Sequence, residues 1–397
     1  MIIWDLVVVG AGPAGLSAAY AAARAGVSTL VVERATHPRY KTCGGGLIGT
    51  SLAAVQDRIE VPAHDRVDRV TFTRDGRREF TRRNDSPVVT MVRREEFDDR
   101  LRAAAVAAGA QMRERVAVRA IEQDTEGVRL RLADGTTIAA RAVIGADGSS
   151  GVTARHVGVR YRQVDLGLEL EIPVPPAEQE RWRGRLLLDW GAMPGSYAWV
   201  FPKNDKLTVG VIAGRGAGEG TRDYLRQFVD RLGLTGLPAE HDSGHLTRCR
   251  EEDSPLRNGR VLVVGDAAGL LEPWSREGIS FALRSGELAG AAVAGGDLTG
   301  YERAVAERLV PEMRAGFRLL DVFTRRPDVF HALLATPPGW RMFVQFCQGR
   351  ASFEEMLRRR PIRAALAVLD RLPGPRRPTV IHPGSEDALR GVTWHWR

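Results

Sequence analysis

A glycine-rich turn near the N-terminus has the spacing of a dinucleotide-binding site. It reads Gly10-Ala11-Gly12-Pro13-Ala14-Gly15. Gly10 permits a tight turn, Gly12 lets the backbone approach a pyrophosphate, and Gly15 allows a helix to pack closely on a strand. Free N–H groups at the start of that helix would attract the negatively charged pyrophosphate.

The segments on either side predict the strand–helix–strand unit that such a turn requires. Residues 5–9 are an apolar, mostly β-branched run typical of a strand buried on both faces. An Ala-rich helix is expected up to Gly26, and a second buried strand over 29–32 ends in Glu33. Glu33 would accept hydrogen bonds from ribose hydroxyls. With its neighbour Arg34, it completes this part of the predicted cofactor site.

Two distant segments indicate which dinucleotide binds. Residues 142–145 and 261–264 are further buried strands, and they lead into Asp147-Gly148 and Gly265-Asp266. Ligands of open α/β sheets bind at the carboxyl ends of strands, where both aspartates stand. A nicotinamide dinucleotide needs neither segment. A flavin needs contacts along its pyrophosphate, its ribityl chain and its ring, so the three segments together favour FAD.

These motifs, in this order, resemble the flavoprotein hydroxylase-like superfamily. The resemblance implies that Asp147 and Asp266 help to hold FAD. It also implies flavin contacts for the residues around them, which are Gly148, Gly265, Gly278 and Ile279. A further signature, R-x-x-F-D, begins at Arg94 and places that residue near the flavin. The expected fold class is α/β, with a Rossmann-type FAD-binding domain like that of p-hydroxybenzoate hydroxylase.

Two more motifs resemble the geranylgeranyl reductase branch of this superfamily. They are K-x-C-G-G-G-L over residues 41–47 and Y-x-W-x-F-P-K over residues 197–203, the latter followed by V-G-V. Members of the branch bind FAD and reduce double bonds of prenyl chains with electrons from NADPH or another donor. The glycines Gly44 and Gly45 would let a flat ring approach the backbone. Cys43 would sense redox state or supply a proton, or it is a small buried residue.

The substrate-pocket candidates are mainly aromatic. Tyr197, Trp199 and Phe201 alternate and therefore share one face of a strand, where they line an apolar pocket or simply form core. Trp274 and Arg276 join them. The branch has glycine where this chain has Arg276, so either the backbone approaches the flavin differently there or Arg276 points at the substrate.

Glu169 and Glu171 also share one face of an expected strand. Two interpretations are open for this pair. It lies on a solvated face, which is the default for alternating charge, or it is an acid pair near the reaction.

The chain divides into three expected parts. Residues 1–65, 91–158 and 245–298 form the FAD-binding domain, and residues 66–90 and 159–244 form an inserted substrate domain of antiparallel strands. Residues 299–397 are a helical region, with helices over 301–325, 326–335 and 351–372 and an extended Pro/Gly-rich segment after 373. Residues 341–377 hold nine arginines against three acidic residues. This segment forms a lid with a solvated face, or it contacts an anionic membrane.

Composition excludes several classes. Of 57 basic residues only three are lysines, and the arginines are interleaved with acidic residues, which argues against nucleic-acid binding. Three widely spaced cysteines form neither a disulfide framework nor a metal site and fit a reducing cytoplasm. No stretch approaches the ~18 apolar residues of a membrane span. No feature predicts a particular oligomeric state.

The leading hypothesis is therefore an FAD-dependent reductase of C=C bonds in a small apolar substrate, isoprenoid or polyketide-like. A monooxygenase or oxidase on the same scaffold is the alternative. A halogenase is a weaker one, because the W-x-W-x-I-P motif is absent. A flavin-binding lipid carrier without turnover is a third. Because there is no second G-x-G-x-x-G, NADPH would bind transiently or another donor would deliver the electrons.

Overall fold

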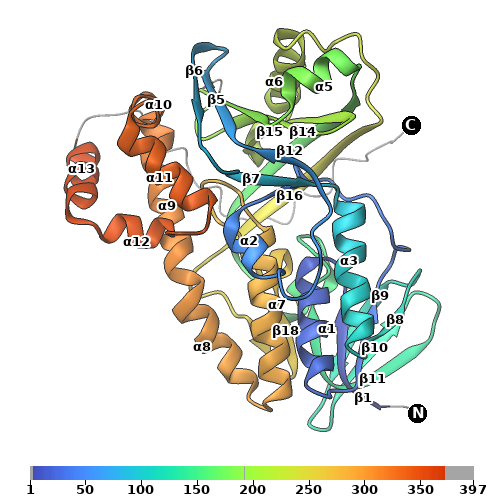
Figure 1. The fold of residues 1–397 in the computed structure, drawn as a ribbon. Helices are drawn as coiled ribbons and strands as arrows, with labels where there is room; N and C mark the ends of the chain where they lie inside the picture. The colour runs from blue at the N-terminus through green and yellow to red at the C-terminus, as the bar shows by residue number, and fades with distance from the viewer. Residues whose placement is uncertain (1–2, 192, 372–397) are drawn as a thin grey trace.

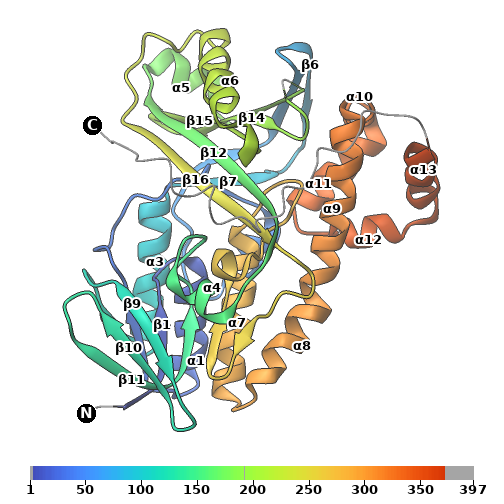
Figure 2. The same cartoon turned by 180° about the vertical axis from the view of Figure 1, so that it is seen from behind.

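A computed structural model describes residues 3–191 and 193–371. Figure 1 shows a first sheet with its helices in the lower half, a second sheet above it, and the C-terminal helices along one side. Figure 2 shows the same three parts from behind. Residues 372–397, which include the extended segment expected after 373, lie outside the described residues.

The first sheet has the strand order β17-β18-β11-β1-β2-β8, and β9 and β10 continue it from β11. Its central pairs, β1 with β2 and β11 and β11 with β18, are parallel. Its strands are β1 (Ile3–Val9), β2 (Thr29–Val32), β8 (Gln111–Arg113), β9 (Val118–Gln123), β10 (Val128–Leu132), β11 (Thr137–Gly145), β17 (Arg257–Asn258) and β18 (Val261–Val263). Each buried strand predicted from the sequence is present, and the α/β fold class is confirmed.

Three helices pack together beside this sheet. They are α1 (Pro13–Arg24), α3 (Arg94–Ala107) and α7 (Ile279–Ala294), with α1 between the other two in Figure 1. The axes of α1 and α7 come close because Gly286 has no side chain. A methyl group there would lie 2.1 Å from the Ala14 carbonyl oxygen. The short helix α4 (Val152–Val157) follows the Asp147 turn.

The second sheet has the strand order β16-β12-β15-β14-β13-β5-β6. Its strands are β5 (Arg69–Arg74), β6 (Arg77–Arg83), β12 (Tyr161–Pro173), β13 (Arg185–Trp190), β14 (Tyr197–Lys203), β15 (Lys206–Gly214) and β16 (His241–Arg250). The expectation of purely antiparallel strands is wrong for one pair, because β5 and β13 are parallel. They come from separate insertions, so no hairpin fixes their direction. β16 also runs unbroken across residue 245, where the sequence placed a domain boundary.

The two faces of the second sheet are covered differently. The helices α5 (Pro176–Trp182) and α6 (Gly218–Arg231) lie over one face, where Ala198 and Val200 join the core. The opposite face meets a small sheet of β3 (Gly46–Leu47), β7 (Val89–Val92) and β4 (Ala63–Val67), and the C-terminal helices. The helix α2 (Gly49–Ala53) contacts β3, α7 and α11 (Pro337–Cys347).

The C-terminal region is helical, as expected, up to residue 371. Its helices are α8 (Leu298–Arg308), α9 (Val310–Arg325), α10 (Pro327–Leu334), α11 (Pro337–Cys347), α12 (Phe353–Arg358) and α13 (Arg360–Arg371). The helix expected over 301–325 is two helices, with Pro311 in the first turn of α9. Within the described residues, the helix expected over 351–372 is also two helices, α12 and α13, and α11 was not expected from the sequence. None of the helices in the described part of the chain is both long and apolar enough to cross a bilayer.

Candidate active site

The glycine turn between β1 and α1 is closed by the protein on one side and open on the other. Gly10 has a φ of +102°, and a methyl group there would lie 2.4 Å from the Ala146 carbonyl oxygen. A methyl group at Gly15 would lie 2.0 Å from the Gly10 oxygen. At Gly12, apart from its chain neighbours, the one atom of the described residues within 4 Å of such a group is Arg39 Nη2, at 3.8 Å. The backbone is therefore accessible at Gly12, where a pyrophosphate would bind.

Glu33 closes this turn from the end of β2. Its side chain is buried and accepts hydrogen bonds from the Ala11 N–H at 2.7 Å and the Ala35 N–H at 2.9 Å. A carboxylate has about four acceptor positions, so ribose hydroxyls can still be bound. Arg34 is exposed.

Sequence reasoning missed Arg39. This side chain donates to the Ala11 carbonyl oxygen at 3.1 Å and pairs with Asp98 at 3.3 Å. It therefore bridges the glycine turn and the helix α3. It lies in an irregular segment after β2, where no motif marks it.

The two aspartates predicted to hold the cofactor stand at the ends of β11 and β18. Asp147 accepts the Thr153 N–H at 3.1 Å, and burial raises its pKa. Asp266 lies 3.2 Å from His245 Nε2. Burial alone would raise the pKa of Asp266, but the His245 hydrogen bond and nearby positive charges outweigh it and lower this pKa. Asp266 is therefore held as a carboxylate.

The segment from Gly265 to Ile279 seats the end of β18 on α1 and starts α7. The Gly265 N–H donates to Ser285 Oγ at 3.0 Å, and a methyl group at Gly265 would lie 2.9 Å from Ala14 Cβ. Gly278 is the N-cap of α7, and Ile279 is its first residue. A methyl group at Gly278 would lie 3.7 Å from Asp266 Oδ1, so the start of this helix stands beside Asp266.

Arg94 is buried at the start of α3. It makes two hydrogen bonds with Asp98, each 2.8 Å long. Burial would lower the Arg94 pKa, but the Asp98 carboxylate and the Cys43 thiol stabilise the cation and raise it. Arg94 thus joins the R-x-x-F-D helix to the Cys43 loop.

The Cys43 loop packs against the second sheet. The Cys43 N–H donates to Glu169 Oε1 at 2.6 Å. A methyl group at Gly44 would lie 2.7 Å from the Phe201 ring, and one at Gly45, where φ is +74°, would lie 2.2 Å from the Val92 oxygen. From the sequence, Gly44 and Gly45 were expected to let a flat cofactor ring approach the backbone. The ring that approaches Gly44 in this structure is that of Phe201.

The aromatic residues of β14 share one face, as predicted. The ring centroids of Tyr197 and Trp199 are 5.8 Å apart, and those of Trp199 and Phe201 are 6.1 Å apart. The Trp199 indole lies over Gly210, where a methyl group would come within 2.2 Å of it. Gly210 is the glycine of V-G-V, so this motif makes the seat for the tryptophan. The buried indole N–H of Trp199 has no acceptor among the described residues and lies beside Gly44.

The other two pocket candidates have different surroundings. Trp274 packs in an aromatic cluster between the second sheet and the C-terminal helices, with its ring centroid 5.1 Å from those of Phe330 and Phe353. Arg276 has a φ of +56° and a buried side chain. Its guanidinium donates to Asp165 at 3.1 Å and to the Gly195 carbonyl at 3.0 Å, so its hydrogen bonds are made within the protein.

Glu169 and Glu171 do not lie on a solvated face; that interpretation is wrong. Their exposed fractions are 2% and 4%. Alternation identified the shared face correctly, but the Cys43 loop and two lysines cover it. Lys203 lies 3.0 Å from Glu171, and Lys206 lies 3.5 Å from it.

A cavity of about 500 Å³ lies between α2, α7 and the C-terminal helices. Its charged lining residues are Glu272, Glu277, Arg284, Glu287, Glu312 and Glu355. Burial raises the pKa of Glu277 to about 7, although Ser280 N–H and Ser51 Oγ donate to its carboxyl group. None of these carboxylates belongs to the residues singled out from the sequence, because they face one another only in the folded chain.

Comparisons with known proteins agree with this geometry. Residues 4–178 match the FAD binding domain family. The menaquinone reductase of Mycobacterium tuberculosis is 32% identical over 72% of this chain and 75% of its own. The chloroplastic geranylgeranyl diphosphate reductase of rice is 28% identical over 89% of this chain and 81% of its own.

Solved structures share the fold. A geranylgeranyl bacteriochlorophyll reductase-like protein of Thermoplasma acidophilum has a TM-score of 0.74 at 20% identity, covering 89% of this chain and 98% of its own. A flavin-dependent brominase has a TM-score of 0.73 at 19% identity, covering 93% of this chain and 100% of its own.

The protein is thus an FAD-dependent oxidoreductase by fold and by site. More narrowly, the chain belongs to the geranylgeranyl reductase family, as its sequence motifs predicted. The residues present fit the cofactor: the turn is open at Gly12, Glu33 has acceptor positions to spare, and the Trp199 N–H lacks an acceptor in the described part of the chain.

Proposed function

We propose that this enzyme reduces C=C bonds of a small apolar substrate, isoprenoid or secondary-metabolite in character, using reduced FAD. The observation that carries the proposal is the Cys43 thiol, held beside Arg94 by a loop that packs on the aromatic face of β14. The relatives named above, a menaquinone reductase and a geranylgeranyl diphosphate reductase, support it.

In this proposal, different residues bind the cofactor, exclude water and donate a proton. The glycine turn, Glu33, Asp147 and Asp266 would hold FAD, which supplies a hydride when reduced. The rings of Tyr197, Trp199 and Phe201 keep water from an apolar substrate. Cys43, or an ordered water molecule, donates a proton to the second carbon, and the Arg94 cation stabilises the thiolate that remains.

The proposal is tested by anaerobic turnover. Enzyme reduced with dithionite is mixed with geranylgeranyl diphosphate or menaquinone, and the product is examined by mass spectrometry. We expect product masses that increase by one H₂ for each bond reduced. Oxygen-containing product that forms only after air is admitted would instead identify a monooxygenase.

A cysteine substitution tests the role of the thiol. We expect Cys43→Ser to keep its flavin and to lose turnover by about 10²-fold, the usual contribution of a positioned proton donor. Cys347→Ala is the matched control, because Cys347 is a buried thiol in the aromatic cluster between the second sheet and the C-terminal helices. Equal turnover in both variants would remove Cys43 from the mechanism.

NADPH is our proposed electron donor, with another protein or small reductant as the other source. Adding NADPH to the oxidised enzyme without oxygen should bleach the flavin absorbance. Bleaching by dithionite but not by NADPH assigns the role to another donor. A flavin that no donor bleaches would favour the carrier hypothesis.

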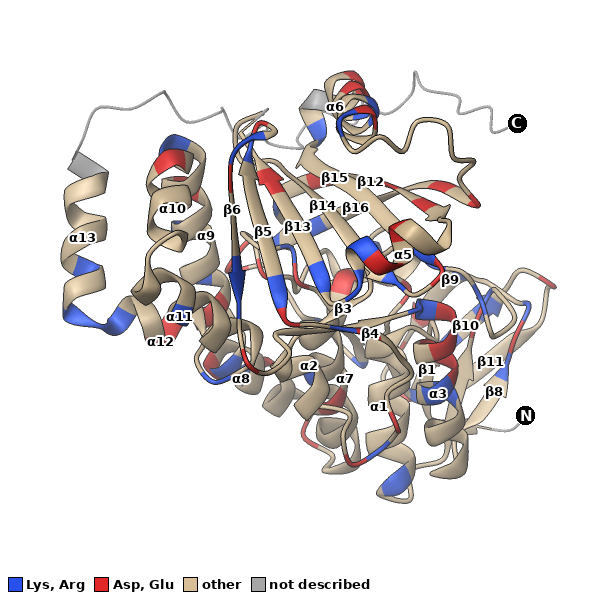
Figure 3. Cartoon of the chain, turned by 45° about the horizontal axis from the view of Figure 1, so that its top comes forward, with Lys and Arg blue, Asp and Glu red and all other residues tan. Residues whose placement is uncertain are grey.

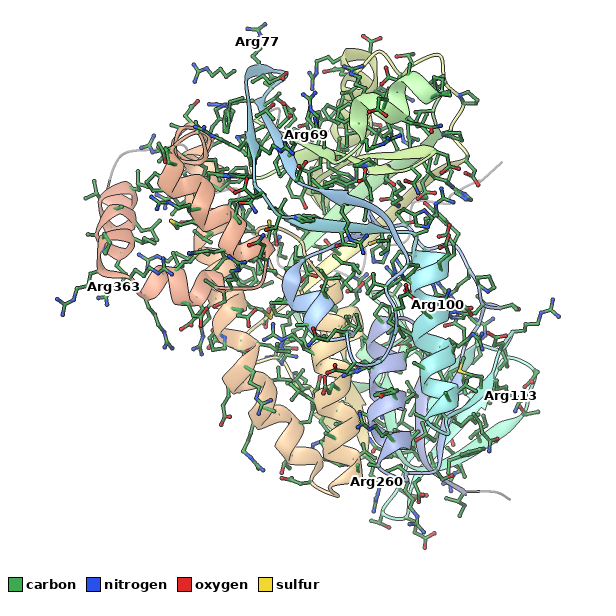
Figure 4. All side chains as sticks on the ribbon, viewed as in Figure 1. Arg69, Arg77, Arg100, Arg113, Arg260 and Arg363 are labelled. Atoms are coloured by element: carbon green, nitrogen blue, oxygen red, sulfur yellow. The ribbon has the colours of Figure 1, made fainter. Side chains whose placement is uncertain are left out.

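We further propose that this is a cytoplasmic protein whose basic C-terminal helices touch an anionic membrane. Arg359, Arg360 and Arg363 are exposed, Val368 of α13 is 58% exposed, and Figure 4 shows Arg363 projecting outward. Anionic vesicles, but not zwitterionic ones, should co-sediment the protein. Replacing the three arginines with glutamine should abolish this, and co-sedimentation that persists unchanged would contradict it.

A further inference from the structure

One row of residues crosses the second sheet beneath the Cys43 loop. Ser243 of β16 pairs with Glu169 of β12, Glu169 with Gly210 of β15, and Gly210 with Trp199 of β14. Residues directly opposite in neighbouring strands point to the same face. The row therefore runs from a polar end at the sheet edge to an aromatic end over which the Cys43 loop is packed.

Glu169 is the residue of this row that contacts Cys43, and it is buried. Its Oε1 accepts the Cys43 N–H at 2.6 Å and the Tyr40 hydroxyl at 3.3 Å. Charged groups that act on it are Lys203, Lys41 and Glu171. Glu169 thus contacts the loop at the residue that carries the thiol.

A chain of hydroxyl groups continues outward from Glu169. The Tyr40 hydroxyl lies 2.8 Å from Ser243 Oγ, and Thr42 Oγ1 donates to the same atom at 3.0 Å. Ser243 is half-buried on the edge strand of the sheet. The Tyr40 ring stacks on His241 at 3.9 Å, and the His241 side chain is 37% exposed. Hydrogen bonds therefore connect the sheet edge with the Cys43 backbone.

Glu171, two residues away on the same strand, has different partners. Burial would raise its pKa, but Lys203 and Lys206 lower it, so Glu171 is ionised. For Glu169, burial outweighs Lys203 and the Cys43 N–H and raises the pKa. Lys203 lies 3.0 Å from Glu171, whereas Lys206 lies 3.5 Å from Glu171 and 2.7 Å from Glu240.

We propose that Glu169 is a proton-holding residue behind Cys43, refilled from solvent through Ser243 and Tyr40. The inference rests on the proposed C=C reduction. There, bound reduced FAD would supply the hydride for one C–H bond, and the thiol proton of Cys43 would form the other. NADPH or another donor would supply the electrons for the next turnover. Glu169 returns a proton to the thiolate and takes one from the hydroxyl chain.

Infrared spectroscopy of the purified, flavin-loaded protein tests the proton on Glu169 without any substrate. Because Glu277 also holds a proton in this pH range, the spectra are recorded in a Glu277→Gln background. The wild-type spectrum minus that of Glu169→Gln should then contain the carbonyl band of a protonated carboxyl group near neutral pH. That variant keeps an oxygen to accept the Cys43 N–H. The matched control is Glu171→Gln/Lys203→Met, which removes the ionised carboxylate with its partner and should leave the band in place. A Glu169→Gln difference spectrum without this band, or loss of the same band in the control, would overturn the proposal.

Isotope exchange tests the path. On transfer to D₂O the carbonyl band shifts as deuterium replaces the proton, and Tyr40→Phe should slow this shift at least tenfold. Phenylalanine keeps the stacking on His241. Tyr20→Phe is the control, because the Tyr20 hydroxyl, on α1, accepts a hydrogen bond from Arg24 at 3.4 Å and is not part of the hydroxyl chain at Glu169. Equal exchange rates in wild type and Tyr40→Phe would rule out the path.

The two proposals can fail separately. If the infrared results hold but no probe gains hydrogen anaerobically, the proton-holding site stands and C=C reduction is wrong. If C=C reduction holds and Glu169→Gln neither loses the band nor changes the solvent isotope effect of turnover, the role of Glu169 is wrong.

Discussion

The two sheets of this protein place their functional side chains differently. In the first sheet the central strands are apolar, and the acidic residues follow them: Glu33 after β2, Asp147 after β11 and Asp266 near the end of β18. In the second sheet the charged residues are buried on the face itself, with Glu169 and Glu171 in β12 and lysines at the turn between β14 and β15. Figure 3 shows charged residues on strands of that sheet.

The two kinds of site depend on different interactions. At strand ends the backbone does much of the binding, so a short motif specifies the site. On a sheet face, a buried charge is tolerated only when a partner from another strand neutralises it. The first kind of site is sensitive to changes of backbone shape, and the second to changes of charge pairing.

Breaking the first kind of site should have its main effect on cofactor binding. In Gly10→Ala the positive φ costs about 1–2 kcal/mol, and the methyl group meets the Ala146 oxygen. Because about 1.4 kcal/mol is tenfold in affinity, we expect bound flavin to fall by at least about tenfold, measured as flavin absorbance per protein. Gly26→Ala also has a positive φ but open space, and it should keep its flavin. Equal flavin content in both variants contradicts this view.

Breaking the second kind of site should destabilise the fold. Glu171→Gln leaves Lys203 buried without its carboxylate, which typically costs about 3–5 kcal/mol. Urea unfolding should show this loss, and Glu171→Gln/Lys203→Met should recover most of it. If the single variant is as stable as wild type, the pair does not stabilise this face.

The carboxyl group of Glu277 differs from that of Glu171 because no lysine among the described residues is paired with it. The pKa of Glu277 is raised by burial from its ordinary value of 4.5 to about 7. The native state therefore retains a proton that the unfolded state releases, so stability falls as pH rises from about 4.5 to 7. The shift corresponds to about 3 kcal/mol. The free energy of unfolding, measured at several pH values, should change less with pH in Glu277→Gln than in wild type. An unchanged pH dependence in the variant would contradict this prediction.

At Gly210 a backbone requirement lies on the charged sheet, and we expect a smaller loss of stability there than at Glu171. A methyl group there meets the Trp199 indole at 2.2 Å, and such overpacking costs about 1–3 kcal/mol. Gly210→Ala should lower the urea midpoint and change the tryptophan fluorescence. Adding Trp199→Leu should restore part of the stability. Additive losses in the double variant would show that the two residues do not interact.

Much of the cofactor site could be predicted. Gly10, Gly15, Glu33 and the two aspartates follow strands that are recognisable as apolar runs, and the structure places them at the ends of those strands. Arg39 was not predicted because it lies in an irregular segment. Its side chain reaches the glycine turn only through the path that the chain takes after β2.

The Cys43 region was predictable in its residues but not in its contacts. The motifs identified the loop, the aromatic strand and the V-G-V segment. They did not show that Phe201 meets Gly44, that Trp199 lies over Gly210, or that Lys203 pairs with Glu171. Those contacts join segments far apart in the sequence.

The sequence by itself therefore determined the family, the α/β class and the residues at the strand ends, because turns, strand patterns and helix starts are local properties. Only the tertiary structure decided which of two neighbouring glutamates is paired with lysine and which lies behind the cysteine. That choice depends on strands and loops brought together by the sheet order, and on burial, which makes the energy of each charge depend on its nearest partner.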